Sequence, residues 1–183
     1  MPFSHAAGAR GGHPAVFMDR DGTLMEEVEY CSDPAQVRAY PGVPEALRAL
    51  KAGGYLTIVI TNQSGIGRGM FTEEQYRAVE AELLRQLGPG AIDATYFCTE
   101  PPGGRSDRRK PATGMVMEAA RDHDIDLSRS FFVGDKAADV ECGRNAGTKT
   151  VLVRTGYGAQ QSCSPDFVTQ DFPGAVRLIL SQK

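Results

Sequence analysis

The sequence predicts an α/β fold in which helices cover both faces of a parallel sheet. Short apolar runs alternate along the chain with segments whose apolar residues recur at helical spacing, as in repeated βαβ units. Polar clusters directly follow several of the apolar runs. The length of 183 residues, 41% of them hydrophobic, fits one domain with a well-buried core.

The apolar runs are the predicted strands. The first ends at Met18, before an Asp-rich turn, and the second, Tyr55–Ile60, is apolar enough for the centre of a parallel sheet. The others are Ala94–Cys98, Phe131–Val133, Thr150–Val153 and a short strand near Phe167–Val168. Right-handed crossovers between them would give a Rossmann-like, three-layer arrangement.

The intervening segments are the predicted helices. Val43–Ala52 has apolar residues at helical spacing and is followed by two glycines, and Thr72-Glu73-Glu74 is typical of a helix start. The other predicted helices cover about 113–124, 139–145 and 173–180. The acidic, turn-rich segment 24–40 follows the first strand, so we expect it to flap over the end of that strand.

Composition excludes several classes of protein. The formal net charge of −3 provides no basic field for nucleic acid, and no apolar run approaches the ~20 residues of a membrane helix. Residues 1–14 lack the apolar core of a signal peptide and are expected to form a flexible leader before a single domain at 15–183. The four scattered cysteines favour reduced thiols. We therefore expect a cytoplasmic monomer that acts on a small molecule.

Two aspartates lie where the first strand ends, in the sequence D-R-D-G-T. Burying carboxylates without partners is costly, so a packed core has no use for Asp19 and Asp21 at this point. One carboxylate could attack a substrate while the other moves a proton. Asp-Gly is also common turn chemistry, so the pair alone is weak evidence.

Other polar residues follow neighbouring strands and strengthen the case. They are Thr61–Ser64, Lys110 beyond the third strand, and Asp135 with Asp139. The carboxyl ends of parallel strands lie along one edge of a sheet, where ligands of such folds bind. The sequence therefore predicts that these side chains converge on one site.

A phosphate monoester is the substrate class that suits this set. A divalent cation would remove the repulsion between an attacking carboxylate and a phosphoryl group, and Mg²⁺ prefers oxygen ligands. Asp19 is the expected nucleophile, Asp21 the acid and base, and Thr61 and Lys110 the groups that stabilise the phosphoryl oxygens. The expected metal-site residues are Asp19, Asp21 through its carbonyl, Asp135 and Lys136, with Asp139 in support.

The ordered motifs D-R-D-G-T, T-N-Q-S-G, R-K-P and G-D-K-x-x-D resemble those of the haloacid dehalogenase-like phosphatases from about Ala15 to Tyr157. The chain is most similar to the subgroup of D-glycero-D-manno-heptose 1,7-bisphosphate phosphatases, which is related to the histidinol phosphatases. This resemblance implies hydrolysis of the 7-phosphate through an aspartyl-phosphate. It also implies a site without a large cap domain, because the motifs are closely spaced. The residues expected to contact substrate are Arg20, Glu27, Val28, Glu29, Tyr30, Asn62, Gln63, Ser64 and Arg109.

One part of the chain departs from this subgroup, which often carries a zinc-binding loop before R-K-P. Cys98 is present, but Glu100 stands in place of a histidine, and Ser106 and Arg108 stand in place of cysteines. One thiolate cannot supply the four ligands of a structural zinc site, so we expect no zinc. Prolines and salt links should hold this loop instead.

Three alternatives remain open from the sequence. The acidic segment would suit the cationic substrate of a histidinol phosphatase, whereas Arg109 would suit a second phosphate. A phosphatase of nucleic-acid 3′ ends shares the D-x-D-G-T chemistry but is disfavoured by the negative net charge. A non-catalytic phosphosugar-binding module is disfavoured because both Asp19 and Asp21 are present.

Overall fold

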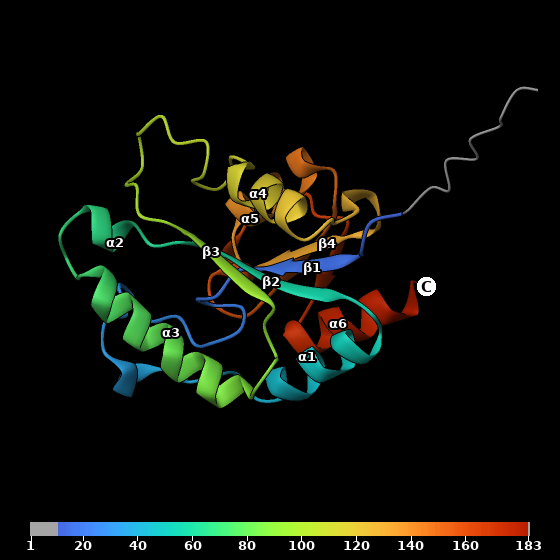
Figure 1. Ribbon diagram of the computed structural model, residues 1–183, viewed down its shortest axis with the longest axis horizontal. Helices are drawn as coiled ribbons and strands as arrows, with labels where there is room; N and C mark the ends of the chain where they lie inside the picture. Colours follow the sequence, from blue (N-terminus) through green and yellow to red (C-terminus); the bar gives the residue numbers. More distant parts are fainter. Residues whose placement is uncertain (1–10, 183) are drawn as a thin grey trace, which may run out of the picture.

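The described residues form one sheet whose strands all run parallel, which confirms the predicted α/β fold. The computed structural model describes residues 11–182, and the sheet order within them is β3-β2-β1-β4-β5-β6 (Figure 1). The strands are β1 (Ala15–Met18), β2 (Leu56–Asn62), β3 (Ala94–Cys98), β4 (Phe131–Gly134), β5 (Lys149–Val153) and β6 (Phe167–Thr169). The order reverses beside β1, so the crevice expected at such a switch point lies next to Asp19.

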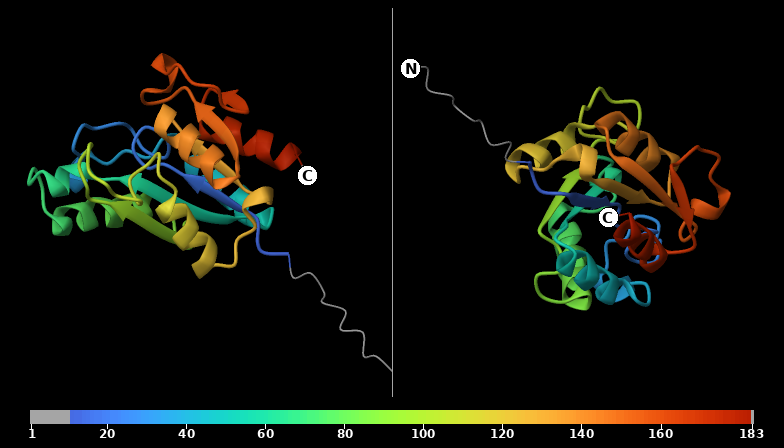
Figure 2. Two further views of the ribbon diagram at one scale, coloured as in Figure 1. Left: turned by 90° about the horizontal axis from the view of Figure 1, so that it is seen from above. Right: turned by 90° about the vertical axis from the view of Figure 1, so that its right-hand side faces the viewer.

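Helices cover both faces of the sheet. They are α1 (Val43–Ala52), α2 (Ser64–Gly67), α3 (Glu73–Leu87), α4 (Gly114–Asp122), α5 (Ala137–Ala146) and α6 (Phe172–Ser181), with short 3-10 turns η1 (Pro34–Gln36), η2 (Leu127–Arg129) and η3 (Gly158–Gln160). In Figure 1, α4 and α5 lie above the sheet, and α1, α3 and α6 lie below it. The right-hand view of Figure 2 shows α1 beside α6 beneath the strands.

Each face of the sheet has its own apolar core, because buried strand side chains alternate between the faces. Val16 and Met18 pack with residues of α1, α3 and α6, whereas Ala15 and Phe17 pack with residues of α4 and α5. Helices therefore cover both faces of β1 and of the strands beside it, β2 and β4. The buried sheet holds the carboxyl ends of β1, β2 and β4 rigidly side by side.

Local sequence determines where several elements begin. The Thr72 hydroxyl accepts from the Gln75 N–H at 3.2 Å, and the Gln75 side chain accepts from the Thr72 N–H at 2.8 Å. This capping box starts α3 at the residue after Thr72, as the sequence predicts. β2 extends two residues beyond the predicted end, because Thr61 and Asn62 still pair with Phe97 and Cys98 of β3.

Two predictions about segment boundaries need correction. Residues 1–10 of the predicted leader lie outside the described residues, but His13 is hydrogen-bonded to Asp124 and Asp126, so the packed chain begins before Ala15. The segment 24–40 also does not flap as a whole. Leu24, Met25 and Val37 are buried in the core, and residues 27–31 are the part of the segment that lies at the carboxyl edge.

No helix within residues 11–182 is long and apolar enough to cross a membrane.

Candidate active site

Three buried carboxylates meet at the carboxyl edge of the sheet. Asp19 follows β1, Asp135 follows β4, and Asp139 lies in the first turn of α5. One carboxylate oxygen of each lies within 4.8 Å of the other two, and the residues are 4%, 0% and 1% exposed. The parallel pairing of Met18 with Val133 places the first two beside each other. Such a cluster requires cations, because buried charge without a partner is costly.

Lys110 supplies one of those cations. Its ammonium lies 2.9 Å from Asp19 Oδ1 and 2.7 Å from Asp139 Oδ1, and it donates to the Ile60 carbonyl at 2.7 Å. Asn62 holds the backbone of Lys110 from both sides, since its Oδ1 accepts from the Lys110 N–H at 3.1 Å and its Nδ2 donates to the Lys110 carbonyl at 3.2 Å. The lysine is therefore fixed at both its backbone and its charged end.

The electrostatics distinguish the three carboxylates. Burial opposes ionisation of Asp19, but Lys110 and Lys136 outweigh it and lower the pKa of that carboxyl. Burial and the neighbouring Asp19 raise the pKa of Asp135 to about 8. Burial likewise raises the pKa of Asp139 in spite of its contact with Lys110. Asp19 is thus the carboxylate that these surroundings keep ionised, as a nucleophile requires.

The cluster suits a hard divalent cation. Asp135 Oδ1 is buried and accepts no hydrogen bond from any described residue, so one carboxylate oxygen is available to an ion. An additional positive charge would also relieve the repulsion that raises the pKa of Asp135. Carboxylate oxygens are the ligands that Mg²⁺ prefers. Asp19 and Asp135, both predicted metal-site residues, are accordingly brought together, and Asp139 joins them.

The other two predicted metal-site residues are placed differently. The carboxylate of Asp21 is outside the cluster, and a contact through its carbonyl stays a prediction. Lys136 brings an ammonium 3.9 Å from Asp135 Oδ1 and 4.0 Å from Asp19 Oδ2, and this ammonium donates to Glu27 at 3.1 Å. Because an ammonium cannot bind a metal ion, any contact from Lys136 would have to come from its backbone.

Asp21 is held by two neighbours. Arg20 donates to Asp21 Oδ2 through Nε and to Oδ1 through a terminal nitrogen, both at 3.0 Å, and Gln63 Nε2 donates to Oδ2 at 3.0 Å. Arg20 is only 2% exposed, and its guanidinium lies over the Tyr76 ring at 5.3 Å. The Arg20 guanidinium is thus paired with Asp21, and its predicted contact with substrate stays a prediction.

A cleft of about 220 Å³ opens beside this cluster. Its lining includes every residue predicted to contact substrate except Arg109, namely Arg20, Glu27, Val28, Glu29, Tyr30, Asn62, Gln63 and Ser64, together with Asp21 and Lys136. A smaller cavity of about 50 Å³ is lined by Asp19, Lys110 and Asp139, and it shares Asp21, Asn62 and Lys136 with the cleft. The small cavity that contains Asp19 and Lys110 therefore adjoins the cleft.

Tyr157 is a site residue that the sequence analysis missed. Its N–H donates to Asp135 Oδ2 at 2.9 Å, the residue is 39% exposed, and its ring centroid lies 5.2 Å from the Lys136 ammonium. It also lines the cleft, as do Cys31, Gly65 and Phe71. The turn T-G-Y-G follows β5, so the rule that polar turns at strand ends form the site could have identified Tyr157.

Thr61 and Arg109 complete the predicted set. Thr61 is buried, and its hydroxyl accepts from Gln63 Nε2 at 2.9 Å, which leaves its O–H free to donate. Arg109 is half-buried and donates to the Glu100 carbonyl at 2.9 Å within its own loop. Its contact with substrate stays a prediction, as does the contact of Thr61 with a phosphoryl group.

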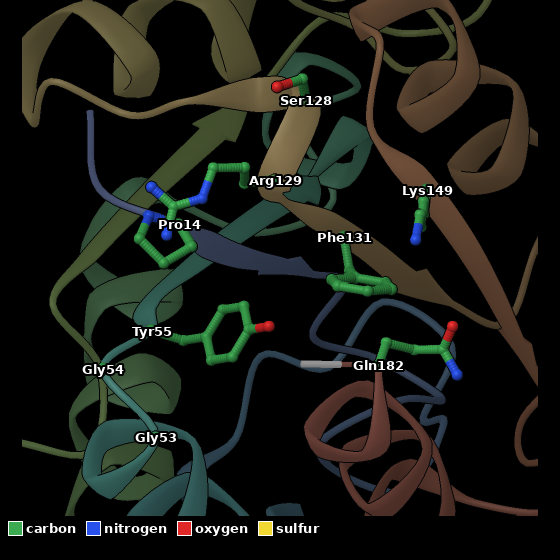
Figure 3. Close-up of a pocket in the computed structure, with 9 residues that line it drawn as sticks. All are labelled: Pro14, Gly53, Gly54, Tyr55, Ser128, Arg129, Phe131, Lys149 and Gln182. Carbon is green, nitrogen blue, oxygen red and sulfur yellow. The ribbon is translucent and has the colours of Figure 1, made fainter. Parts of the chain in front are cut away.

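A larger cavity, about 600 Å³, lies at the opposite edge of the sheet (Figure 3). The rings of Tyr55 and Phe131 and the cationic ends of Arg129 and Lys149 line it, together with Pro14, Gly53, Gly54, Ser128 and Gln182. These residues lie at the amino ends of the strands, and none of them belongs to the predicted site. The predicted catalytic residues Asp19 and Asp21 therefore line the smaller cavities and not this one.

The fold and this carboxylate edge define a haloacid dehalogenase-like hydrolase. Residues 107–175 match the family model described as HAD-hydrolase-like. The structure is similar to that of "D,D-heptose 1.7-bisphosphate phosphatase from B. bronchiseptica complexed with magnesium and phosphate", with a TM-score of 0.85 and 29% identity over 93% of this chain and 99% of that one.

Sequence comparison identifies the family within this class. The chain is 40% identical to the D-glycero-D-manno-heptose-1,7-bisphosphate 7-phosphatase of Thermosynechococcus vestitus, over 91% of this chain and 95% of that protein. It is 37% identical to the D-glycero-beta-D-manno-heptose-1,7-bisphosphate 7-phosphatase of Yersinia pestis, over 90% and 95% of the two chains. The chain belongs to the heptose 1,7-bisphosphate 7-phosphatase family of HAD-like phosphatases.

Proposed function

We propose that this chain is a Mg²⁺-dependent phosphatase that removes the 7-phosphate of D-glycero-D-manno-heptose 1,7-bisphosphate through a phosphorylated Asp19. The observation that carries the proposal is the ion-paired cluster of Asp19, Asp135, Asp139 and Lys110, which opens into a polar cleft. The activity for which the relatives at 40% and 37% identity are named supports the choice of substrate.

In the first step, Asp19 attacks phosphorus, and the bond from phosphorus to the sugar oxygen breaks. Lys110 and the Thr61 hydroxyl would stabilise the phosphoryl oxygens, while Asp21 protonates the leaving sugar oxygen. In the second step, Asp21 takes a proton from water, which attacks phosphorus and releases Asp19. When bound by Asp19 and Asp135, Mg²⁺ would neutralise phosphoryl charge.

Arg20 and Gln63 would assist these steps by positioning Asp21. Both donate to its carboxylate, and the Arg20 guanidinium is buried. A planar guanidinium paired with both oxygens fixes the orientation of a carboxylate better than a single hydrogen bond does. These contacts keep Asp21 in the lining of the cleft, where it would protonate the leaving oxygen.

We also propose that the loop before Lys110 needs no zinc. Ser106 Oγ lies 3.8 Å from Cys98 Sγ, and Arg108 is ion-paired with Glu118. The residues at these positions thus have protein partners of their own. Metal analysis of the purified protein tests this point, and one tightly bound zinc ion per chain would refute it.

Product analysis tests the activity. Purified protein with Mg²⁺ is expected to convert heptose 1,7-bisphosphate to the 1-phosphate, identified by ³¹P NMR, and to lose this activity in EDTA. Histidinol phosphate, assayed in parallel, is expected to be the poorer substrate. A large preference for histidinol phosphate would overturn the substrate, and full activity in EDTA would overturn the mechanism.

A further inference from the structure

The loop that joins β3 to α4 carries two of the predicted site residues. Residues 99–113 contain neither a helix nor a strand, yet they present Arg109 and Lys110 in succession. A loop can hold a binding residue accurately only when its own path is fixed by contacts with rigid elements. The contacts that fix this loop therefore bear on substrate binding.

Arg108 ties the loop to two such elements. One terminal nitrogen donates to the Phe97 carbonyl in β3 at 3.1 Å, and the other donates to both carboxylate oxygens of Glu118 in α4. The Arg108 N–H also donates to Ser106 Oγ at 3.2 Å. The ion-paired side chains are 36% and 30% exposed, so solvent screens them only partly. A single guanidinium thus joins the loop, a strand and a helix.

Lys110 has separate anchors. Its backbone is held by Asn62, and its ammonium is held by Asp19 and Asp139. Among the described residues, the Arg109 side chain in contrast donates to Glu100 and its carbonyl accepts from the Ala112 N–H at 2.8 Å, and both partners belong to the same loop. Loss of the Arg108 contacts would consequently loosen the loop on the amino-terminal side of Arg109 and leave Lys110 in place.

We infer that Arg108 is a positioning residue for substrate: its contacts with Glu118 and Phe97 hold the loop so that Arg109 faces the distal phosphate of a bisphosphate. The inference rests on the proposed function, since it requires a substrate with a second phosphate. Arg108 itself need not touch the substrate. Its effect should appear in KM for the bisphosphate more than in kcat, because the groups at the reacting phosphate are held independently.

Four variants test this role: Arg108→Gln, Glu118→Gln, the charge swap R108E/E118R, and Arg105→Gln as a control. Arg105 is an exposed cation of the same loop, so its loss matches the charge change of Arg108→Gln. Arg108→Gln and Glu118→Gln are each expected to raise KM for heptose 1,7-bisphosphate by about tenfold and to change kcat by less than about threefold. The control is expected to keep both constants within about twofold of wild type.

Two further readouts separate positioning from a general structural role. The charge swap restores the ion pair but not the bond to Phe97, so KM should recover to within about threefold of wild type. Turnover of p-nitrophenyl phosphate, which has no second phosphate, should change by less than about twofold in every variant. The inference would be overturned if folded Arg108→Gln has the wild-type KM for the bisphosphate. It would also be overturned if KM of the charge-swap variant is as high as KM of the single variants.

Hydrogen exchange gives an answer that does not depend on the substrate. Amides of residues 99–109 should exchange faster in Arg108→Gln than in wild type, whereas those of β2 should not. If wild type fails to hydrolyse the bisphosphate, the proposed function fails, and the exchange data still report on the anchor. Unchanged exchange in the loop would refute the anchor even if wild type is active.

Discussion

Replacing Asp135 with asparagine should stabilise the metal-free protein and abolish its response to Mg²⁺. Asp135 is fully buried, and it is the carboxylate whose pKa the fold raises to about 8. Asparagine has nearly the same shape, and its oxygen can still accept the Tyr157 N–H that Asp135 accepts at 2.9 Å. The substitution therefore removes a charge that the metal-free fold disfavours, without removing the backbone contact.

The size of the effect follows from the pKa shift. Folding moves the pKa of Asp135 from 3.8 to about 8, and each unit between the folded and unfolded states corresponds to about 1.4 kcal/mol. At pH 7 the unfolded carboxyl is ionised and the folded one is protonated, so about three units contribute, or ~4 kcal/mol. We expect Asp135→Asn to gain about 2–4 kcal/mol, the lower figure allowing for water beside the carboxyl.

The sign of the pH dependence is fixed by the same shift. Because the folded pKa lies above the unfolded one, the folded state binds the additional proton, and stability from this group falls as pH rises from 3.8 to about 8. The advantage of Asp135→Asn over wild type should therefore grow across this window. Asp124→Asn, the same substitution at an exposed position, is the matched control for the change of side chain.

Urea unfolding in EDTA at several pH values measures these differences, and repeating it with Mg²⁺ measures the ion's contribution. Wild type should gain stability with Mg²⁺ and Asp135→Asn should not. The reasoning is refuted if Asp135→Asn is less stable than wild type at pH 7 without metal, or if the difference does not change with pH.

Three other variants probe different parts of the account. Asn62→Ala removes both hydrogen bonds to the Lys110 backbone, so kcat should fall about 10- to 100-fold with little change in Tm, and an unchanged kcat would contradict the positioning of Lys110. Thr72→Ala removes half of the capping box and should lower the free energy of unfolding by about 1 kcal/mol in urea, with normal activity. Tyr157→Ala should raise KM about fivefold, whereas Tyr157→Phe, which keeps the ring near Lys136, should match wild type. Equal KM values for the two variants would show that the ring does not contribute to substrate binding.

Elements defined by local patterns could be predicted from the sequence. Val43–Ala52 and Ala94–Cys98 have the predicted bounds, because the first has apolar residues at helical spacing and the second contains strand-favouring Thr95, Tyr96 and Phe97. The four-residue α2 was missed, since Ser-Gly-Ile-Gly has neither apolar periodicity nor helix-favouring residues. Convergence of Asp19 and Asp135 was predictable, because both follow neighbouring parallel strands, whereas the place of Lys110 also depends on the loop after β3.

Side-chain partners within the site were less predictable. The contact of Arg20 with Asp21 was not predicted. Alternation of side chains along an extended chain indicates only that Arg20 and Asp19 point to opposite sides. The two bonds between Asn62 and Lys110 depend on the path of a 15-residue loop, 99–113, which no local pattern specifies. The ammonium of Lys136 near Asp19 and Glu27 likewise results from tertiary packing, because neither residue is close to Lys136 in sequence.

Trapping the phosphorylated enzyme identifies the carboxylate that attacks phosphorus. Asp21→Asn with Mg²⁺ and heptose 1,7-bisphosphate is quenched within one turnover and treated with borohydride, which reduces an acyl phosphate to an alcohol. Peptide mass spectrometry should then find the reduced side chain at position 19 and at no other carboxylate. A phosphorylated enzyme modified at another residue, or no modification while product forms at the wild-type rate, would contradict the role of Asp19 as nucleophile.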